Sequence, residues 1–469
     1  MSILRPRLHF TARQYWLNDP NGLVYAGGAY HLFYQHNPRA NEHGYMSWGH
    51  ATSPDLLTWT EHDVALPWRE RHDVFSGSAV VDWHNTSGLG QPGDPHPPVV
   101  AMYTAAGYYH QAQHLALSRD GGTTWDFATP KPVLDEGRQD FRDPKTVWHA
   151  VSGQWVSVVV HPNERQIGVY GSPDLQVWQP LSTFGPAGGV DGIWEVPDLF
   201  PLTDSGGHER WVMKVDVFAG GPQGGTGAQY WVGDFDGVTF TPTQDARWAD
   251  HGRDFYAAIT YSDLPDAGRR VWLAWMNSWD YAGVLPTHPW RGAMTLPREL
   301  GLVRDGSGWV LTQEPVRELD ALRQGRTPLI GPRQEVEVVA GQPLDLTVTV
   351  PRSSQLTVAF ASESGTEATV RVGGGVLSLN RPGPADVPKF AGTHTASLPD
   401  GAADIDLRVI LDTCSLEVFA CGGRVGLTDL LLPSSPIVRV TVEGQTTGEV
   451  WMLRPSMPVE AADVQDVGR

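Results

Sequence analysis

The chain has 469 residues and carries 34 Lys and Arg against 53 Asp and Glu, a formal net charge of −19. At about 150 residues per domain, this length predicts two or three domains with room for a buried core. The acidic balance argues against a nucleic-acid partner, because affinity for nucleic acids comes mainly from Lys and Arg that neutralise phosphates. The 52 Gly and 37 Pro favour a turn-rich, all-β protein over a helical one.

The start of the chain and its cysteines bear on location. The first 16 residues lack the apolar stretch of a signal peptide, and no later run reaches the ~18–20 apolar residues of a membrane span. We therefore expect a cytoplasmic protein without a membrane partner. Two cysteines, Cys414 and Cys421, are too few for a disulfide scaffold and form no CxxC pattern. We expect both to be reduced, and a bridge between them stays open as the alternative.

Aromatic residues divide the chain. Eighteen of the 19 Trp lie between Trp16 and Trp309, and only Trp451 follows. An acidic region this rich in Trp, Tyr and His suits a sugar-binding cleft, where aromatic faces stack on CH groups and carboxylates accept hydrogen bonds from hydroxyls. The expected parts are a first domain at 1–314, a linker with a short helix at 315–332 and a second domain at 333–469.

The first domain contains a repeated turn. Residues 53–59 (SPDLLTW) recur as 172–178 (SPDLQVW), with a looser copy at 118–125 and a weaker one at 234–240. Each copy is a turn rich in Asp, Gly or Pro, followed by an aromatic residue that can close a hairpin. The spacing of about 60 residues matches one propeller blade of four short strands. Over about 300 residues this spacing predicts a five-bladed β-propeller, with a β-sandwich of the same length as the alternative.

Single acidic residues form a second series in phase with the first. They are Asp19, Asp73, Asp143, Glu195 and Asp254. Equivalent positions of successive blades surround the central axis of a propeller at one end, so we expect these acids to converge on one funnel. Their neighbours include Trp, Phe, Ile and Pro, and partial desolvation raises the pKa of a carboxyl group. Perturbed carboxyl groups gathered in a cleft are a candidate catalytic site.

Paired carboxyl groups in an aromatic cleft, without a metal motif, point to cleavage of glycosidic bonds. One carboxyl group must start protonated and another ionised. Glu195 has the most apolar sequence neighbours of the five acids and is the candidate general acid. Asp19 lies among amide and turn N–H groups that can hold it ionised, which suits a nucleophile. Asp143 follows Arg142, and we expect it to be paired, charged and used to bind hydroxyls.

No other pattern in the first domain predicts a cofactor or a metal. His110 and His114 are four residues apart, but their surroundings are typical of a strand. The Gly-rich segment 220–227 lacks the GK[ST] of a phosphate loop, which predicts a flexible loop at the funnel rim. We therefore expect neither a cofactor nor a metal site.

The sequence changes character after residue 314. Residues 315–324 place Val316, Leu319 and Leu322 on one helical face, with Pro near the start, which predicts the connecting helix. From about residue 333 to 455, alternating apolar and polar residues predict a C-terminal β-sandwich. We expect this sandwich to stabilise the propeller, with a second sugar-binding site there as the alternative.

Six short motifs follow one another along the chain. They are WLNDPNG at 16–22, FYQ at 33–35, WGHATSPDLLTW at 48–59, FSGSA at 75–79, FRDP at 141–144 and WEVPDLF at 194–200. In this order they resemble glycoside hydrolase family 32, the β-fructosidases. Segments within 252–300 and at 412–419 are also similar to the family, so the resemblance covers the whole chain. The sequence departs from the family at Leu17, where Met is common, and at Val196, where most members have Cys.

The resemblance implies a retaining β-fructofuranosidase that acts through a covalent fructosyl-enzyme, which requires carboxyl groups about 5–5.5 Å apart. Asp19 would be the nucleophile, Glu195 the acid/base and Asp143 the group that stabilises the transition state. The substrate would be a terminal β-D-fructofuranosyl unit of sucrose, a fructooligosaccharide or a fructan. The sugar-binding residues implied by the matching positions are Asn18, Gln35, Trp48, Phe75, Ser76, Arg142, Asp254 and Trp290.

Two other functions stay open at this stage. A fructosyltransferase would use the same site to pass the fructosyl group to another sugar. A lectin-like propeller would bind sugar without turnover, although the three acids argue against it. The partner in every case is a small carbohydrate. The sequence does not rank the possible substrates, and it leaves both a monomer and a homodimer open.

Overall fold

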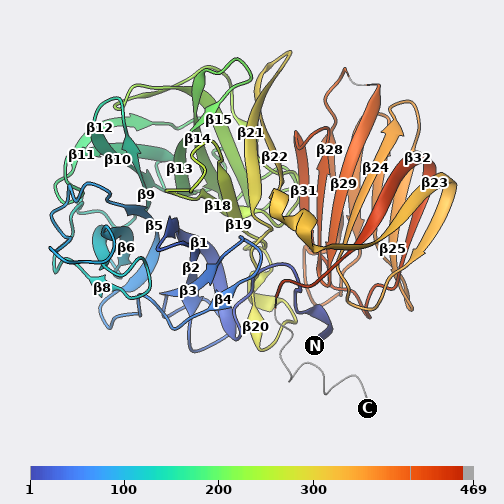
Figure 1. The fold of residues 1–469 in the computed structure, drawn as a ribbon, viewed down its shortest axis with the longest axis horizontal. Helices are drawn as coiled ribbons and strands as arrows, with labels where there is room; N and C mark the ends of the chain where they lie inside the picture. The colour runs from blue at the N-terminus through green and yellow to red at the C-terminus, as the bar shows by residue number, and fades with distance from the viewer. Residues whose placement is uncertain (1, 402, 458–469) are drawn as a thin grey trace.

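The expected five-bladed β-propeller and C-terminal β-sandwich are confirmed in a computed structural model, which describes residues 2–401 and 403–457. Figure 1 shows the blades in blue to yellow, with the sandwich in orange to red beside the last blade. The described residues form strands, turns and loops, together with three short 3₁₀ helices. These helices are η1 (Ser2–Leu4), η2 (Ala282–Val284) and η3 (Arg317–Leu322).

Each blade is a separate antiparallel sheet, and the inner strands β1, β5, β9, β13 and β18 contact one another around the ring. Blade 1 contains β1 (Tyr15–Ala26), β2 (Ala29–Asn37), β3 (Ser47–Ser53) and β4 (Thr60–Glu61). Blade 2 contains β5 (Asp73–Val81), β6 (Val99–Ala106), β7 (Gln111–Ser118) and β8 (Asp126–Phe127). Blade 3 contains β9 (Arg142–His149), β10 (Gln154–His161), β11 (Gln166–Ser172) and β12 (Gln179–Phe184). Blade 4 contains β13 (Trp194–Thr203), β14 (Glu209–Val217), β15 (Gly227–Phe235), β16 (Phe240–Pro242) and β17 (Arg247–Trp248). Blade 5 contains β18 (Tyr256–Thr260), β19 (Val271–Trp275), β21 (Arg298–Asp305) and β22 (Gly308–Pro315).

The repeated turn of the sequence joins the third and fourth strands of blades 1 to 4. In each copy an Asp Oδ1 accepts hydrogen bonds from two backbone N–H groups that follow it within four residues. The four residues are Asp55, Asp120, Asp174 and Asp236. Such an Asx turn reverses the chain locally, and this explains why one short motif marks every one of these hairpins.

The ring is closed by hydrogen bonds between its last and first blades. The chain leaves blade 5 after β19, and β20 (Trp290–Arg291) pairs in parallel with the start of β1. Tyr15 N donates to Pro289 O at 2.6 Å. Because the two ends of the propeller are joined in this way, the inner strands are held in a fixed ring around the central axis.

Every inner strand is irregular in its register. The pairing shifts in β1, β5, β13 and β18, and β10 shifts opposite β9. Asp143, Val196 and Ala257 have positive φ angles of 61°, 46° and 58°. A bulge of this kind rotates the next side chain relative to the regular pleat. It thereby turns selected side chains of the inner strands towards the end of the channel.

The sandwich follows η3 directly, so its first strand begins at Arg323 rather than at residue 333. Its strands are β23 (Arg323–Glu337), β24 (Leu344–Pro351), β25 (Leu356–Ser362), β26 (Gly365–Gly373), β27 (Val376–Arg381), β28 (Gly392–Ser397), β29 (Asp404–Asp412), β30 (Ser415–Ala420), β31 (Val425–Leu430) and β32 (Arg439–Leu453). β32 pairs with β25 over its first part and with β24 over its second part. This strand therefore links the two layers into one hydrogen-bonded sheet. Cys414 and Cys421 are both free.

Buried charges join the propeller to the sandwich. His9, from the segment before β1, contacts Asp412 Oδ2 through Nδ1 and Glu417 Oε1 through Nε2, both at 2.8 Å. Arg298, the first residue of β21, donates to Glu417 and to Asp250. All five side chains are almost fully buried. Burial lowers the pKa of His9, but its hydrogen bonds to the two acids raise the pKa to about 9 overall.

The folding stability is expected to depend on the protonation of His9. A pKa raised from 6.5 to about 9 stabilises the fold below about pH 6.5, and this contribution is lost as the pH rises through 9. A shift of this size corresponds to a loss on the order of 3 kcal/mol. Urea unfolding at pH 6 and pH 10 should show this loss in the parent protein, but not in His9→Gln.

The matched control for His9 is His110→Gln. His110 also contacts an acid, Asp135, at 2.8 Å, but its side chain is 50% exposed. Its replacement should leave the difference between the two pH values unchanged. If His9→Gln keeps the full pH dependence of the parent, the assignment of the buried charge to His9 is wrong.

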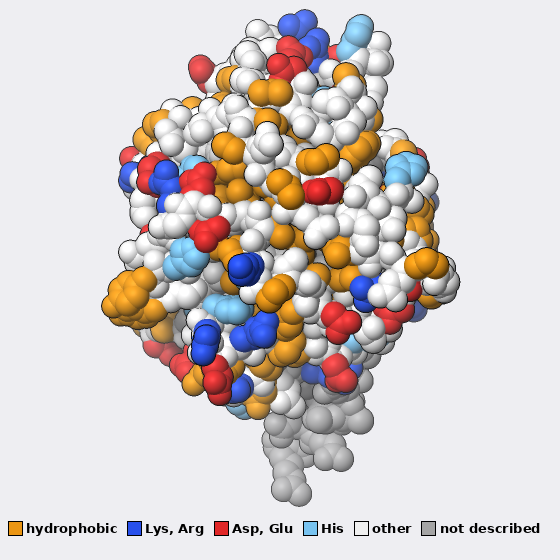
Figure 2. Space-filling model, turned by 90° about the vertical axis from the view of Figure 1, so that its left-hand side faces the viewer, with side chains coloured by type: hydrophobic (Ala, Val, Ile, Leu, Met, Phe, Trp, Pro, Cys, Tyr) orange, Lys and Arg blue, Asp and Glu red, His pale blue; other side chains and the backbone are white. Residues whose placement is uncertain are grey.

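The outer surface of the propeller carries charges of both signs. On the face shown in Figure 2, Lys and Arg side chains lie beside Asp and Glu side chains, with hydrophobic side chains scattered among them. Within the described ranges, no helix is long and apolar enough to cross a membrane.

Candidate active site

A pocket of about 480 Å³ lies at the end of the central channel where the chain enters the inner strands. Side chains from all five blades or their connecting loops contribute to it. Its lining residues are Asn18, Asp19, Gln35, His43, Phe75, Ser76, Gln111, Asp140, Arg142, Asp143, Glu195, Phe218 and Trp279. Three of the five acids predicted to converge therefore meet in one pocket.

Asp19 is held on β1 by neutral hydrogen-bond donors. Its Oδ1 accepts a hydrogen bond from Asn18 Nδ2 at 3.0 Å, and its Oδ2 accepts one from Ser76 Oγ at 2.7 Å. Trp16 Nε1 donates to Asn18 Oδ1 at 2.7 Å and so fixes the amide. Burial and the negative charge of Glu195 raise the pKa of Asp19 to about 6, although the two hydrogen bonds lower it. Burial therefore outweighs the donors that the sequence suggested would hold the carboxylate ionised.

Glu195 on β13 lies between two donors. Its Oε1 accepts a hydrogen bond from Arg142 Nη2 at 3.0 Å, and its Oε2 accepts one from the Tyr256 hydroxyl. Arg142 also donates to Asp140 Oδ1 at 3.0 Å, and its Nε lies 3.9 Å from Asp143 Oδ2. The guanidinium group therefore contacts three carboxyl groups at once, and it links the two inner strands β9 and β13 at the pocket.

Hydrogen bonds to neighbouring blades hold both the backbone and the carboxyl group of Asp143. Its own N–H donates to Thr104 Oγ1 at 3.0 Å, and its Oδ2 accepts a hydrogen bond from the Val196 N–H at 2.9 Å. Burial raises the pKa of Asp143 to about 7, although Arg142 lowers it. The sequence predicted a paired and charged carboxylate. The pairing is present, but burial favours the neutral form more than that prediction assumed.

Val196 is one of the two residues at which the sequence departs from the family pattern, and its backbone explains part of its role. A φ of 46° is unfavourable for a β-branched residue. Its C=O accepts a hydrogen bond from Lys214 Nζ at 3.1 Å, while its N–H binds Asp143. Both backbone polar groups of Val196 are therefore hydrogen-bonded. These two hydrogen bonds join β13 to β14 and to β9.

Three of the predicted sugar-binding residues do not line this pocket. Trp48 is 1% exposed, and its Nε1 donates to Phe75 O at 3.0 Å, so it supports the pocket wall from behind. Trp290 is 3% exposed and lies in β20, where it closes the ring. Asp254 is fully buried and accepts hydrogen bonds from Arg381 and Tyr281. The structure therefore assigns these three residues to packing and to contact with the sandwich.

The acid of blade 2 also lies outside the pocket. Asp73 Oδ1 accepts a hydrogen bond from Met46 N at 3.0 Å. The blade repeat of the sequence relates Asp73 to Asp19. In the structure, the bulge in β5 instead directs Ser76 into the pocket. The expected convergence of all five acids is therefore wrong for Asp73 and Asp254.

Comparison with known proteins identifies the family. Residues 9–315 match the glycosyl hydrolases family 32 N-terminal domain, and residues 318–453 match the family 32 C-terminal domain. The chain belongs to glycoside hydrolase family 32. It is therefore a glycoside hydrolase, as the motifs of the sequence predicted.

Several family 32 relatives are similar over most of the chain. A levanase of Bacillus subtilis is 41% identical over 454 residues, which cover 92% of this chain and 66% of the levanase. An extracellular exo-inulinase of Aspergillus awamori is 37% identical, covering 95% of this chain and 93% of the relative. The exo-inulinase is described as extracellular, so the cytoplasmic location expected from the sequence has no support among these relatives.

Solved family 32 structures share the arrangement of both domains. The crystal structure of the Aspergillus awamori exo-inulinase superposes with a TM-score of 0.89 at 34% identity, covering 97% of this chain and 99% of that chain. A β-fructofuranosidase of Schwanniomyces occidentalis, complexed with fructosyl-erythritol, gives a TM-score of 0.88 at 29% identity. These matched regions cover 96% of this chain and 97% of that chain.

Residues that sequence reasoning missed line the pocket of this family 32 chain or contact the residues that line it. Trp279 stacks on Trp16, with ring centroids 5.7 Å apart, and lies next to Phe218 and His43. Tyr256 binds Glu195. Trp279 and Tyr256 lie in the fifth-blade segments that resemble the family, which is a signal that could have found them. His43 and Phe218 lie in loops without such a signal.

The donor set of the family 32 pocket suits organic substrates. Among the residues that the structure describes, no group of three or more His, Cys, Asp or Glu side chains is arranged to hold a metal ion. The polar groups are carboxyl, amide, hydroxyl and guanidinium groups, which are the partners of sugar hydroxyls. An aromatic side formed by Phe75, Phe218 and Trp279 offers apolar surface to CH groups.

Proposed function

We propose that this chain is a retaining β-fructofuranosidase that releases terminal β-D-fructofuranosyl units from sucrose, fructooligosaccharides or fructans. The observation that carries the proposal is the convergence of Asp19, Asp143 and Glu195 in one pocket. Relatives described as a levanase and an exo-inulinase support the same class of substrate.

In the first step, Asp19 attacks the anomeric C2 of the fructosyl unit while Glu195 gives a proton to the leaving oxygen. The C2–O bond breaks as the C2–carboxylate bond forms. In the second step, Glu195 takes a proton from water, which attacks C2 and releases Asp19. Ser76 and Asn18 fix the direction of the Asp19 oxygens, so little reorientation is needed before attack.

Asp143 serves as a positioning group for sugar hydroxyls in this proposal. The Val196 N–H holds its carboxyl group, and Arg142 lies between it and Glu195. A change at Arg142 would therefore disturb the acid/base and the hydroxyl-binding carboxyl group together. Gln35, whose Nε2 donates to Val74 O at 3.0 Å, leaves its carbonyl oxygen available to a hydroxyl group.

Product analysis tests the proposed reaction. Incubation with sucrose, inulin or levan should release fructose as the first product, as separated by chromatography. Longer oligosaccharides would indicate transfer in place of hydrolysis, and short fructan fragments would indicate cleavage within the chain. NMR of the first anomer formed should show retained configuration at C2, and an inverted first product would contradict the roles of Asp19 and Glu195.

The pH dependence of kcat/KM should report the ionisation of Asp19. Its pKa of about 6 predicts that kcat/KM falls below about pH 6, because a protonated carboxyl group is a poor nucleophile. Ser76→Ala removes a hydrogen bond that lowers this pKa, so its acidic limb should move to higher pH. Steady-state rates with sucrose between pH 4 and pH 8 measure the acidic limb of the parent protein and that of Ser76→Ala. If the two acidic limbs lie at the same pH, the assignment of the limb to Asp19 is wrong.

A further inference from the structure

A second cavity lies further along the same inner strands, on the side of the channel away from the active-site pocket. It has a volume of about 390 Å³ and shares no lining residue with that pocket. Strand β13 shows the separation: it places Glu195 in the active-site pocket and Phe200 in the second cavity. Five strand residues span roughly 15 Å. We call this second site the rear cavity.

Two exposed tryptophans form part of the wall of the rear cavity. Trp83 is 61% exposed and Trp148 is 41% exposed, whereas most Trp side chains of this protein are buried. Trp83 Nε1 donates to Asp263 Oδ1 at 2.8 Å, and Trp148 packs against Trp155 with ring centroids 5.1 Å apart. Both rings are therefore held in place while a large part of their surface faces solvent. Rigid, exposed aromatic surface beside a cavity is typical of a ligand site.

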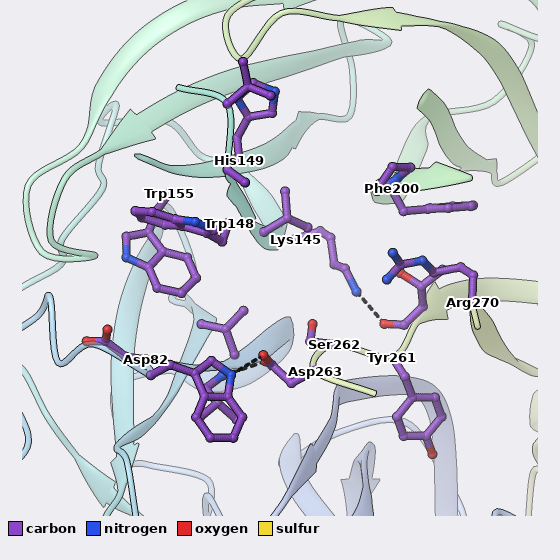
Figure 3. Close-up of a pocket in the computed structure, with 18 of the residues that line it drawn as sticks. Asp82, Lys145, Trp148, His149, Trp155, Phe200, Tyr261, Ser262, Asp263 and Arg270 are labelled. Carbon is purple, nitrogen blue, oxygen red and sulfur yellow. Dashed lines mark hydrogen bonds between the residues drawn. The ribbon is translucent and has the colours of Figure 1, made fainter. Parts of the chain in front are cut away.

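Arg270 supplies unused hydrogen-bond donors to the rear cavity. Its guanidinium makes no hydrogen bond to any residue of the described ranges, and its buried Nε has no partner. Figure 3 shows the Lys145 side chain reaching towards the middle of the cavity, with Arg270 on one side and the Trp148 and Trp155 rings on the other. The Lys145 amine already donates to Thr260 O. Arg270 is therefore the cation that remains free to bind a ligand, because an unpaired buried donor is unfavourable.

The charges around the rear cavity decide the class of ligand. Lys145 Nζ lies 3.8 Å from Asp198 Oδ1, and the negative charges that act on Arg270 are those of Asp198, Asp263 and Glu209. Acids therefore balance both cations, which leaves no excess positive charge for a phosphate or a carboxylate. A purely apolar ligand would desolvate these charged groups without replacing their hydrogen bonds.

We propose that the rear cavity is a second, non-catalytic carbohydrate-binding site. A neutral sugar of one or two rings offers an apolar CH face to Trp148, hydroxyl oxygens to Arg270 and hydroxyl protons to Asp263. The volume is within the range of small-molecule sites. If the substrate is a polymeric fructan, binding at this second site would raise the effective concentration of chain ends near the active site. That consequence rests on the proposed function, but the binding itself does not.

Fluorine NMR of protein labelled with 5-fluorotryptophan tests this site. The Asp19→Asn variant provides the background, so that sucrose and short fructooligosaccharides are not consumed. Single Trp→Phe replacements at positions 83, 148, 279 and 451 assign the four resonances needed. During titration with each sugar, the Trp83 and Trp148 resonances should shift and saturate together. Trp279 reports the active-site pocket separately, and Trp451 in the sandwich should not move.

Arg270→Gln provides the decisive comparison. It should raise the Kd for sugar, as measured from the Trp148 resonance, by about tenfold, because it removes a charged hydrogen-bond donor. It should leave the response of Trp279 and the parental rate of sucrose hydrolysis unchanged. A Trp148 resonance that ignores every sugar while Trp279 responds would overturn the rear site. A stronger response to inorganic phosphate than to sugars would overturn the assigned ligand class. A response of Trp148 without one of Trp279 would instead support the rear site and contradict the proposed function.

Discussion

An Asp19→Ala variant is expected to lose at least about 10⁴-fold in kcat for sucrose hydrolysis. The carboxylate forms the covalent bond to C2 in the proposed mechanism, and no other group in the pocket replaces it. Ser76 and Asn18 donate to Asp19, so they would be left facing an empty space. The isosteric Asp19→Asn should be similarly inactive, because an amide keeps the shape of the side chain but is not a nucleophile. Initial rates with sucrose measure both variants.

Azide separates a lost nucleophile from a lost fold. In Asp19→Ala, azide can enter the space of the missing carboxyl group and attack C2 while Glu195 protonates the leaving oxygen. The product is then a fructosyl azide of inverted configuration, detectable by NMR. Circular dichroism should show an unchanged fold. Recovery of activity by azide with retained configuration would contradict the role of Asp19.

Asp73→Asn is the matched control for Asp19. Both acids belong to the series that recurs with the blades, but Asp73 lies outside the pocket, where it accepts hydrogen bonds from the Met46 N–H and the Trp68 side chain. Its replacement should change kcat by no more than a few-fold. A loss of kcat comparable to that of Asp19→Ala would mean that replacing either acid lowers kcat by disturbing the fold, and that the loss in Asp19→Ala does not identify a nucleophile.

The propeller is predictable from the sequence because its signals are local. Asp55 binds the backbone N–H groups of Leu57 and Thr58, and Asp174 binds those of Gln176 and Val177. A turn that depends on contacts within four residues uses similar residues wherever it occurs, here in blades 1 to 4. Its spacing of about 60 residues over a domain of about 300 residues therefore predicts five blades before any long-range contact is known.

The assignment of sugar-binding residues is less predictable because side-chain direction depends on distant partners. Asp254 has the same spacing as the other acids, but its carboxylate pairs with Arg381, 127 residues further along the chain. Trp290 lies in a motif shared with the family, and the parallel pairing of β20 with β1 draws it into the ring closure. No local pattern reveals either partner. By contrast, Asp19 and Ser76 come from neighbouring inner strands whose ends are placed by the blade repeat itself.

The buried charges between the domains also escape sequence reasoning, although they carry a large expected effect on stability. Arg298 is fully buried and donates to Glu417, Asp250, Gln313 and Thr428. Phe255 and Phe419 lie over its guanidinium, at 4.6 and 4.9 Å from the ring centroids. These partners come from blade 5, the segment before it and the sandwich. One side chain therefore joins the two domains.

Arg298→Met is expected to lower the free energy of unfolding by about 3–5 kcal/mol, because it leaves Asp250 buried without a cation and takes from Glu417 one of its two cationic partners, the other being His9. Urea unfolding at pH 7 measures this loss. The double variant Arg298→Met/Asp250→Asn should recover part of it, since the unpaired charge of Asp250 is then removed. Arg333→Met breaks an exposed pair with Glu335 and Glu443 and should leave the transition midpoint unchanged. If Arg298→Met unfolds at the parental midpoint, the network is incidental to stability. The apolar contacts between propeller and sandwich would then suffice to hold the two domains together.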